Sequence, residues 1–343
     1  SLTLNGAGSG NTIIQASVSS ADATHRVFLI TGDKPNVAIS GVNIRHGLSS
    51  GDSSSGGGGI YNLDGTLTLT NSTVSDNTAN ANGGGIWNSG ALTLTNSTIS
   101  GNNSDPVGAG SFSSRVGGGI FNLGPGTLTI ANSTVSGNTA GGGGGGIYDW
   151  ALGAVVGSVT VINSTISGNT ATGGGGLFNN TASIIKLINT IVANNPSNGD
   201  CRRHGVTSLG HNLDSDGTCG FNATGDKSNV NPKLGPLADN GGPALTHALL
   251  PGSPAINAIP SQDCVVTRDQ RGAFRPQGAG CDIGAYEYMV PGDANADGVV
   301  GVVDLRIVGA DLGGLGRGDL NLDGVIDVLD LVLAALNLGR PGA

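Results

Sequence analysis

The sequence predicts an all-β chain that folds as a parallel β-helix, and three observations carry this prediction. The stretch Gly56–Ala79 returns almost unchanged from Gly83, Gly117, Gly141 and Gly173, and self-similarity at a period of a few tens of residues is the signature of a solenoid. Each copy contains a run of alternating apolar residues and threonine, which predicts a strand. Each copy also ends in asparagines at matching positions.

Each repeat is expected to hold about three short strands separated by corners. It opens with a glycine run and a triplet such as Ile60–Asn62, followed by a glycine turn and the alternating run Leu67–Thr70. This alternation predicts a half-buried strand with leucine inward and threonine outward. A change of phase at Asn71 predicts a corner, after which Val74 points inward. Strands of successive coils would then stack in parallel at about 4.8 Å, so each coil bonds only to its neighbours.

Two columns of asparagine support this stacking. The first column is Asn71, Asn96, Asn132, Asn163 and Asn189, and the second is Asn77, Asn102, Asn138, Asn169 and Asn194. Asparagine tolerates left-handed corners, and its amide can bond the same residue of the next coil. The alternative is a set of glycosylation sequons, but alignment at matching corners favours the ladder. In these features the sequence resembles right-handed parallel β-helices of the pectin-lyase-like kind, a resemblance that implies the fold only.

The composition limits the classes of function. The 343 residues include 24 acidic against 15 basic side chains, a net charge of −9, which argues against nucleic-acid binding. No apolar run approaches the ~20 residues needed to cross a bilayer. The chain begins at Ser1 without a signal peptide, so a mature or trimmed product is expected. Four cysteines without metal-ligand spacing predict disulfides and an oxidising compartment. Of the three connectivities, we predict Cys201–Cys219 and Cys264–Cys281, because each pair closes a short loop.

The chain divides into three predicted parts. Residues 1–195 are expected to form the coils, beginning directly on a strand, with surface insertions at Asn103–Val116 and Ala151–Ser158. Residues 196–290, where the repeat decays, are expected to form terminal coils and a disulfide-containing C-terminal cap. Residues 291–343 are expected to form a small α-helical calcium-binding module.

A second resemblance rests on motifs in the region after the coils. They are Ser208–Leu213, Asn231–Pro243, Thr246–Ile256, Asp269–Gly272, Arg275-Pro276 and Cys281–Glu287. Together they resemble the choice-of-anchor Q family of bacterial surface β-helix proteins, over roughly residues 1–290. The resemblance implies export and attachment through a variable C-terminal module, and it implies no established catalytic residues.

The tail contains two loops with the spacing of calcium ligands. The first, Asp293–Asp304, has oxygen-bearing side chains at loop positions 1, 3, 5 and 12, with Gly298 at position 6, where the loop must turn sharply. The second, Asp319–Asp330, repeats this pattern and adds Asp327 at position 9. Without a bound metal, the carboxylates of this acidic segment would repel one another. Two bound calcium ions are therefore predicted.

Two such loops, each with an aspartate at position 12, resemble a type I dockerin. A short amphipathic helix is expected after each, over Leu305–Leu312 and Leu331–Leu338. The resemblance implies calcium ligands at Asp293, Asn295, Asp297, Asp304, Asp319, Asn321, Asp323, Asp327 and Asp330 and at the carbonyls of Val299 and Val325, with a water at Gly301. Cohesin-binding dockerins tend to be polar at positions 10 and 11. Here these positions hold Val302, Val303, Val328 and Leu329, which favours docking onto another apolar surface.

An enzyme active site is the competing interpretation. Cleavage of polysaccharides needs paired carboxylates, or calcium-binding acids with a nearby base, on one face. The charged residues of the coils fall at different repeat phases, and they are Asp64, Asp76, Asp105, Asp149, Arg115 and Lys186. The richest polar cluster is expected to be a buried salt-bridge network rather than an active site, and it comprises His247, Asp269, Arg271, Arg275, Asp282 and Glu287. No catalytic residue is predicted.

An aromatic row is the remaining candidate for a ligand site. We place six residues at one repeat position, namely Tyr61, Trp87, Phe121, Tyr148, Trp150 and Phe178. They are expected to form a stacked structural row rather than a sugar-binding stripe.

The expected function is that of an exported, non-catalytic surface or matrix protein, a rigid rod with a calcium-dependent docking tail. The partner is another copy of the chain or a cohesin, and the uncovered first strand favours head-to-tail assembly into extracellular filaments. The alternative is a carbohydrate-binding or polysaccharide-degrading β-helix protein tethered through its dockerin to a cohesin scaffold. Surface polysaccharide is a further candidate partner. No nucleic-acid partner and no membrane span is expected.

Overall fold

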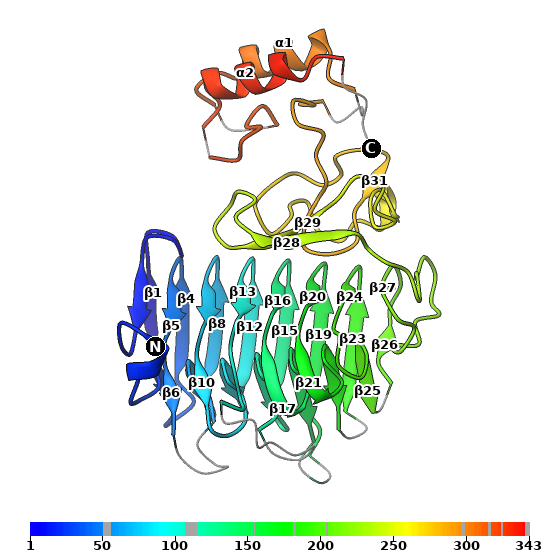
Figure 1. Cartoon of the computed structure of the whole chain (residues 1–343). Coiled ribbons are helices and arrows are strands. Elements are labelled where there is room, and N and C mark those ends of the chain that lie inside the picture. Colours follow the sequence, from blue (N-terminus) through cyan, green and yellow to red (C-terminus); the bar gives the residue numbers. More distant parts are fainter. Residues whose placement is uncertain are drawn as a thin grey trace.

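The body of the protein is a stack of parallel coils around one apolar core (Figure 1). The computed structural model describes the chain except residues 51–55, 107–114, 152, 154, 181–182, 204, 296–298, 315–316, 324 and 340–343. Three long sheets surround the core, and each regular coil adds one strand to each sheet. The parallel β-helix that the repeat predicts is therefore the observed architecture.

All strand pairs within the three sheets are parallel. Sheet A consists of β1 (Leu2–Asn5), β4 (Asn36–Ser40), β8 (Thr66–Thr70), β12 (Ala91–Thr95), β15 (Thr127–Ala131), β19 (Ser158–Ile162), β23 (Ile184–Ile188) and β26 (Thr207–Ser208). Sheet B consists of β2 (Ile13–Gln15), β5 (Asn43–Arg45), β9 (Thr73–Ser75), β13 (Thr98–Ser100), β16 (Thr134–Ser136), β20 (Thr165–Ser167), β24 (Ile191–Ala193) and β27 (Leu213–Asp214). Sheet C consists of β3 (Phe28–Ile30), β7 (Ile60–Asn62), β11 (Ile86–Asn88), β14 (Ile120–Leu123), β18 (Ile147–Trp150), β22 (Leu177–Asn179) and β25 (Cys201–Arg203).

The remaining elements are short and lie between or outside these sheets. Two pairs join coils between sheets B and C, namely β6 (Leu48–Ser49) with β10 (Thr78–Ala79), and β17 (Thr139–Gly143) with β21 (Thr170–Gly173). Outside the stack lie the antiparallel pairs β28 (Leu234–Ala238) with β29 (Thr246–Leu249), and β30 (Ile259–Pro260) with β31 (Gly280–Cys281). The 3-10 turns are Ser20–Asp22 and Ser261–Asp263, and the helices are α1 (Val302–Ala310) and α2 (Val328–Leu336).

The core follows the alternation that the sequence predicts. In sheet A, Leu67 and Leu69 are fully buried, and they pair in register with Leu92 and Leu94 of the next coil. In sheet B, Val74 is fully buried between the hydroxyl residues Thr73 and Ser75 of its own strand. At each inward-facing strand position, the apolar side chains of successive coils therefore form a column through the interior of the stack.

The glycine runs are explained by close packing between coils. A Cβ atom on Gly58 would lie 2.2 Å from the carbonyl oxygen of Thr78, and one on Gly143 would lie 2.7 Å from a ring carbon of Phe178. Real Cβ atoms do not come so close, so a side chain at either position would push coils or rings apart. Glycine here is a requirement of the packing.

The first asparagine column forms left-handed corners, as predicted. All five of its members have φ between 45° and 53°. The Asn96 amide donates to Asn71 Oδ1 at 3.2 Å, and Asn189 donates to Asn163 at 3.4 Å. The amide of Asn132 instead donates to the carbonyl of Arg268, in a segment that lies outside the stack.

The second asparagine column is a continuous buried ladder, with one correction. Amide-to-amide bonds of 2.9 to 3.1 Å link its members in the order Asn77, Asn102, Asn138, Asn169 and Asn195. The last member is thus Asn195, and the prediction of Asn194 was wrong by one residue. Asn194 has φ 58° and occupies the left-handed position of Asp76 in an earlier coil. Asparagine suits both positions, so residue type alone does not separate them.

The region predicted as a C-terminal cap covers two different surfaces. Cys201, Cys219 and Phe221 join the main core, so the first disulfide lies at the end of the stack. From residue 231 the chain turns back, and residues 231–290, here called the cover segment, lie along the outer face of sheet B (Figure 1). The outward-facing hydroxyls of Thr98, Thr134 and Thr165 on sheet B provide hydrogen-bond partners for this segment. The second disulfide, Cys264–Cys281, lies within this segment, so both pairs are those that the sequence predicts.

The tail has its own small core and two helices. Val308, Leu320, Ile326 and Ala334 form a separate apolar cluster between α1 and α2. Both helices begin three residues before the predicted positions and end two residues earlier. The reason is capping: Asp304 Oδ2 accepts the N–H of Gly301 at 2.6 Å, so the helix begins within the loop itself.

Candidate functional site

The aspartate-rich loops of the tail are held by the starts of the two helices. Asp304 and Asp330, at loop position 12, are fully buried in the first turns of α1 and α2. Asp304 Oδ1 accepts the N–H of Asn295 at 3.0 Å, and Asp330 Oδ1 accepts the N–H of Asn321 at 3.1 Å. In both loops the carboxylate at position 12 therefore binds the backbone at position 3. The two halves of the tail are built alike.

The second loop is ordered by its own side chains. Asp319 Oδ1 and Asn321 Oδ1 both accept the N–H of Asp323, at 3.1 and 3.0 Å. Asp323 Oδ1 accepts the N–H of Val325 at 2.9 Å. Asp327 caps α2 by accepting the N–H of Leu329 at 2.7 Å. These bonds draw the loop into a tight turn.

The oxygen-bearing side chains of the two loops are of the kind that binds a hard cation. Those that the structure describes do not, however, converge on one point. Carboxylate, amide and carbonyl oxygens are the ligands that calcium prefers. Within the described residues, however, no three His, Cys, Asp or Glu side chains are placed to hold a metal ion. Asp297, predicted at position 5 of the first loop, lies outside the described residues. The position-12 carboxylates are engaged with backbone N–H groups instead.

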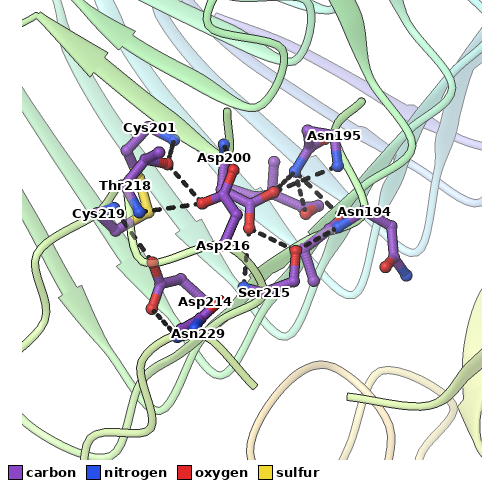
Figure 2. Close-up of a disulfide and its surroundings, with 12 residues drawn as sticks. Asn194, Asn195, Asp200, Cys201, Asp214, Ser215, Asp216, Thr218, Cys219 and Asn229 are labelled. Atoms are coloured by element: carbon purple, nitrogen blue, oxygen red, sulfur yellow. Dashed lines mark hydrogen bonds between the residues drawn. A yellow bond between two sulfur atoms is a disulfide. The ribbon is translucent and has the colours of Figure 1, made fainter. Parts of the chain in front are cut away.

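A second acidic cluster, which the sequence analysis missed, surrounds the Cys201–Cys219 disulfide. Figure 2 shows Asp200, Asp214 and Asp216 there, all bonded to N–H and O–H donors. Asp200 Oδ1 accepts the Asn195 amide at 2.9 Å, so it ends the asparagine ladder. Burial raises the pKa of Asp200, and hydrogen bonds from Ser215 and Asn195 lower it in part. Both carboxylate oxygens of Asp200 accept hydrogen bonds, from Asn195 and from Ser215, so this group is engaged inside the stack.

The polar cluster weighed as an active site is an internal network of the cover segment. Arg271 pairs with Asp269 at 2.8 Å and Arg275 with Glu287 at 2.9 Å, and all four side chains are buried. Arg271 also lies 3.6 Å from the centre of the Tyr286 ring. These arginines therefore hold the cover segment together, as the sequence predicts.

Burial shifts the remaining ionisable groups of this network. It raises the pKa of Asp282 well above the ordinary value, and the neighbouring charge of Glu287 adds to the shift. Burial also raises the pKa of Glu287, against the effect of Arg275. It lowers the pKa of His247, whose Nδ1 donates to the Gly235 carbonyl while Nε2 accepts the Ser136 hydroxyl, each at 2.8 Å. His247 thus attaches the cover segment to sheet B.

The charged residues of the coils are dispersed. Asp105 forms an ion pair of 2.8 Å with Arg115 across an insertion. Asp149 lies in a third ladder that the sequence analysis missed, in which 2.7–2.8 Å amide bonds run from Asn62 to Asn88, from Asn88 to Asn122 and from Asn122 to Asp149. The repeated Asn in each Ile–aromatic–Asn triplet is the signal that would have revealed it.

The aromatic row is a packed column with one misplaced member. Tyr61 stacks on Trp87 with ring centres 4.3 Å apart, and Tyr148 stacks on Phe178 at 4.8 Å. Trp150 pairs in register with Leu123, not with the column, and meets Tyr148 edge-on. Phe121, Tyr148 and Phe178 are fully buried. These three rings are closed to a ligand, whereas Tyr61 is half-buried.

Comparisons with known proteins give one short similarity. Residues 132–149, which run from a corner asparagine through β16 and β17 into β18, match the Chlamydia polymorphic membrane protein repeat. No curated protein and no solved structure is significantly similar to the chain. In the described part of the chain, no helix has the length and apolar character to cross a membrane.

Proposed function

We propose that this chain is a secreted or surface-exposed β-helical rod with a structural role, and that its tail docks the rod onto a protein partner. The observation that carries the proposal is a pair of like loop–helix units, each presenting two exposed apolar side chains at the start of its helix. Val302 and Val303 are 75% and 53% exposed, and Val328 and Leu329 are 65% and 61% exposed. Apolar side chains gathered on a surface mark interaction sites.

Two findings support a location outside the cytoplasm. Disulfides persist in oxidising compartments and are rare in the cytosol, and this chain has two. The matched repeat belongs to a membrane protein of Chlamydia by its description. A match to such a repeat is consistent with exposure of this chain at a cell surface.

Calcium is the proposed organiser of the docking module. The oxygen-rich spacing of Asp293–Asp304 and Asp319–Asp330 supports this assignment. The ordered turn at Asp323 supports it further, because position 5 is already drawn toward positions 1 and 3. Bound calcium would stabilise the loops, and with them the positions of the exposed residues on α1 and α2.

A non-catalytic role is favoured over a polysaccharide-cleaving one. The two buried ion pairs join residues of the cover segment to each other. A general acid or base must come within hydrogen-bond reach of a substrate, and these groups are buried. The alternative, an enzyme tethered to a cohesin scaffold, would need a carboxylate pair elsewhere.

The proposed partner is a second copy of this chain, because apolar residues replace the polar selectors expected for a cohesin. The test is sedimentation of the full chain in calcium over a range of concentrations. The double variant Val302→Thr/Val328→Thr is expected to lose self-association. Val265→Thr, a control for another exposed apolar residue, which is 51% exposed, is expected to keep it.

Two results would contradict the docking proposal. One is a chain that stays monomeric in calcium at every concentration, and the other is association that the double variant leaves intact. Calcium-dependent binding of an immobilised cohesin by a monomeric chain would favour the tethered alternative.

A further inference from the structure

A groove lies between the outer face of sheet B and the loop that joins β28 to β29. Its volume is about 610 Å³. One wall carries the hydroxyls of Ser75, Ser100 and Ser136, which occupy the same position in three successive coils. The opposite wall is the loop from Leu237 to Leu245. The groove is therefore formed by a regular surface on one side and an irregular loop on the other.

The loop is fixed along its length, so the groove is preformed. Thr98 Oγ1 donates to the carbonyl of Leu245 at 2.7 Å, and Ser136 bonds His247 at 2.8 Å. The Ser9 hydroxyl donates to the carbonyl of Pro243 near the first coils. From Asn43 to Ser136 the groove spans three steps between coils, or about 14 Å at ~4.8 Å per step. It lies along the axis of the rod.

The lining selects for a neutral, hydroxylated ligand. Asp76 and Asp239 are the charged residues among those that line the groove, and no Lys, Arg or His accompanies them. Carboxylates with no cationic side chain among the lining residues repel an anionic chain and accept hydrogen bonds from sugar hydroxyls. The hydroxyls of Ser75 and Ser136 already donate to Asn43 Oδ1 and to His247 Nε2, so they offer lone pairs to a sugar rather than a proton. Leu237, Pro243 and Leu245 supply apolar contacts for the C–H faces of a sugar ring.

The geometry disfavours a peptide. A peptide gains affinity by adding a strand to a free sheet edge. Here the groove crosses the face of sheet B, and the backbone groups of β9, β13 and β16 are already paired with neighbouring coils. A peptide would therefore find side-chain hydroxyls but no backbone ladder.

We propose that this groove binds a segment of a neutral glycan chain, a few sugars long, lying along the rod. This site lies on the coils and is independent of docking through the tail. A rod that assembles by its tail would thus carry a glycan contact on its side.

The rim of the groove offers a variant that fills it without a steric clash. Gly101 and Gly137 line the groove at the left-handed position occupied by Asp76 in the preceding coil. A Cβ atom on Gly137 would meet nothing within 4 Å. Asparagine already occupies the equivalent place as Asn194, with φ 58°. Gly137→Asn is therefore compatible with the fold and adds a side chain at the rim.

Gly220 is the matched control. It has the same left-handed backbone, with φ 65°, and it does not line the groove. A Cβ atom on Gly220 would meet nothing within 4 Å. Gly220→Asn carries the same chemical change and the same backbone demand outside the site.

The experiment is calorimetric titration of the full chain with cellohexaose, xylohexaose and mannohexaose, and with hexagalacturonate as an acidic probe. At least one neutral hexasaccharide is expected to bind and hexagalacturonate to bind more weakly. Gly137→Asn is expected to weaken binding about tenfold, because the added side chain occupies part of the groove; a tenfold change corresponds to about 1.4 kcal/mol of binding free energy. Gly220→Asn is expected to leave binding unchanged.

The proposal is overturned if no neutral hexasaccharide binds, if hexagalacturonate binds best, or if Gly137→Asn and Gly220→Asn bind alike. Should Gly137→Asn fail to fold, Asp239→Asn decides, because it removes one groove carboxylate charge while the side chain can keep its bond from the Gly241 N–H. Unchanged neutral-glycan binding by that variant would then refute the assignment.

Discussion

Asp149 stands in a column that asparagine forms in the preceding coils. Its Oδ1 accepts the Asn122 amide at 2.7 Å, and the side chain is fully buried. Burial raises its pKa, while hydrogen bonds from Asn122 and Ser183 lower it in part. An aspartate at this place therefore costs stability whenever it is ionised, whereas an asparagine would continue the ladder without charge.

Asp149→Asn is expected to stabilise the coils at neutral pH by about 1–3 kcal/mol, the scale of a buried group that lacks full satisfaction. The pKa of Asp149 is raised in the folded state, so its protonated form favours folding below the unfolded pKa, and this contribution is lost as pH rises through the folded pKa. The gain should thus be largest at neutral pH and shrink in acid. Thermal unfolding followed between neutral pH and acid measures it.

Asn88→Asp is the matched control for this change. It places a carboxylate two steps back in the same ladder, between Asn62 and Asn122, and is expected to lower the melting temperature at neutral pH. If Asp149→Asn destabilised the protein at neutral pH, or stabilised it equally at all pH values, buried charge would not be the cause.

At the scale of elements, one aspartate in each loop–helix unit of the tail both caps the helix and ties the loop to it. Asp304 and Asp330 each accept a backbone N–H from the residue before the helix, at 2.6 and 2.9 Å. They also bind the backbone at the opposite end of the loop. This bond pattern is why the helices begin inside the loops. A module of this size buries little apolar surface, so metal binding is expected to contribute to its folding.

Removal of calcium is therefore expected to unfold the tail and leave the coils folded. Calorimetry of the full chain should show two transitions in calcium and lose one of them in excess chelator. Asp323→Asn should reduce the effect of calcium, since it removes one carboxylate from the second loop, whereas Asp311→Asn, outside both loops, should leave it unchanged.

Loss of both transitions in chelator would mean that the coils also depend on metal. Loss of neither would mean that calcium does not stabilise the tail. Either result contradicts the predicted assignment. If calcium affected Asp323→Asn and Asp311→Asn equally, calcium binding by the second loop would be contradicted.

At the scale of the whole molecule, the cover segment is attached to sheet B by a few long-range bonds. Gln270 is fully buried, accepts the Thr134 hydroxyl at 2.6 Å and donates to Thr98 Oγ1 at 2.9 Å. It thus joins two neighbouring coils to the cover segment. Ala285 adds a bond from its N–H to Thr165 at 3.1 Å.

Gln270→Ala is expected to weaken this attachment by about 1–3 kcal/mol, because it leaves the buried Thr134 hydroxyl without the acceptor it donates to. Hydrogen exchange should rise in residues 231–290 while the strands of sheets A and C stay protected. Gln262→Ala, at an exposed position of the same segment, should change neither. Uniform loss of protection over all coils would mean that the cover segment and the stack unfold as one unit.

The sequence by itself determined most of what recurs from coil to coil. The apolar columns through Leu67 and Val74 and the corners at Asn71 follow from the repeat, because in a stack each residue meets its own equivalent in the next coil. The spacing of the tail loops likewise placed two helices, and short loops selected the disulfide pairs. These features depend on local geometry that a pattern of residue types already contains.

The tertiary structure decided what does not recur. It placed Asn195 rather than Asn194 in the ladder and moved Trp150 off the aromatic column, since neighbouring residues of suitable type can exchange roles until the register is fixed. It also laid the cover segment along sheet B and so formed the groove. The bond between Gln270 and Thr134 joins residues 136 positions apart, and no periodicity links them. Contacts of that kind arise only when the finished coils present a surface against which an irregular chain can pack.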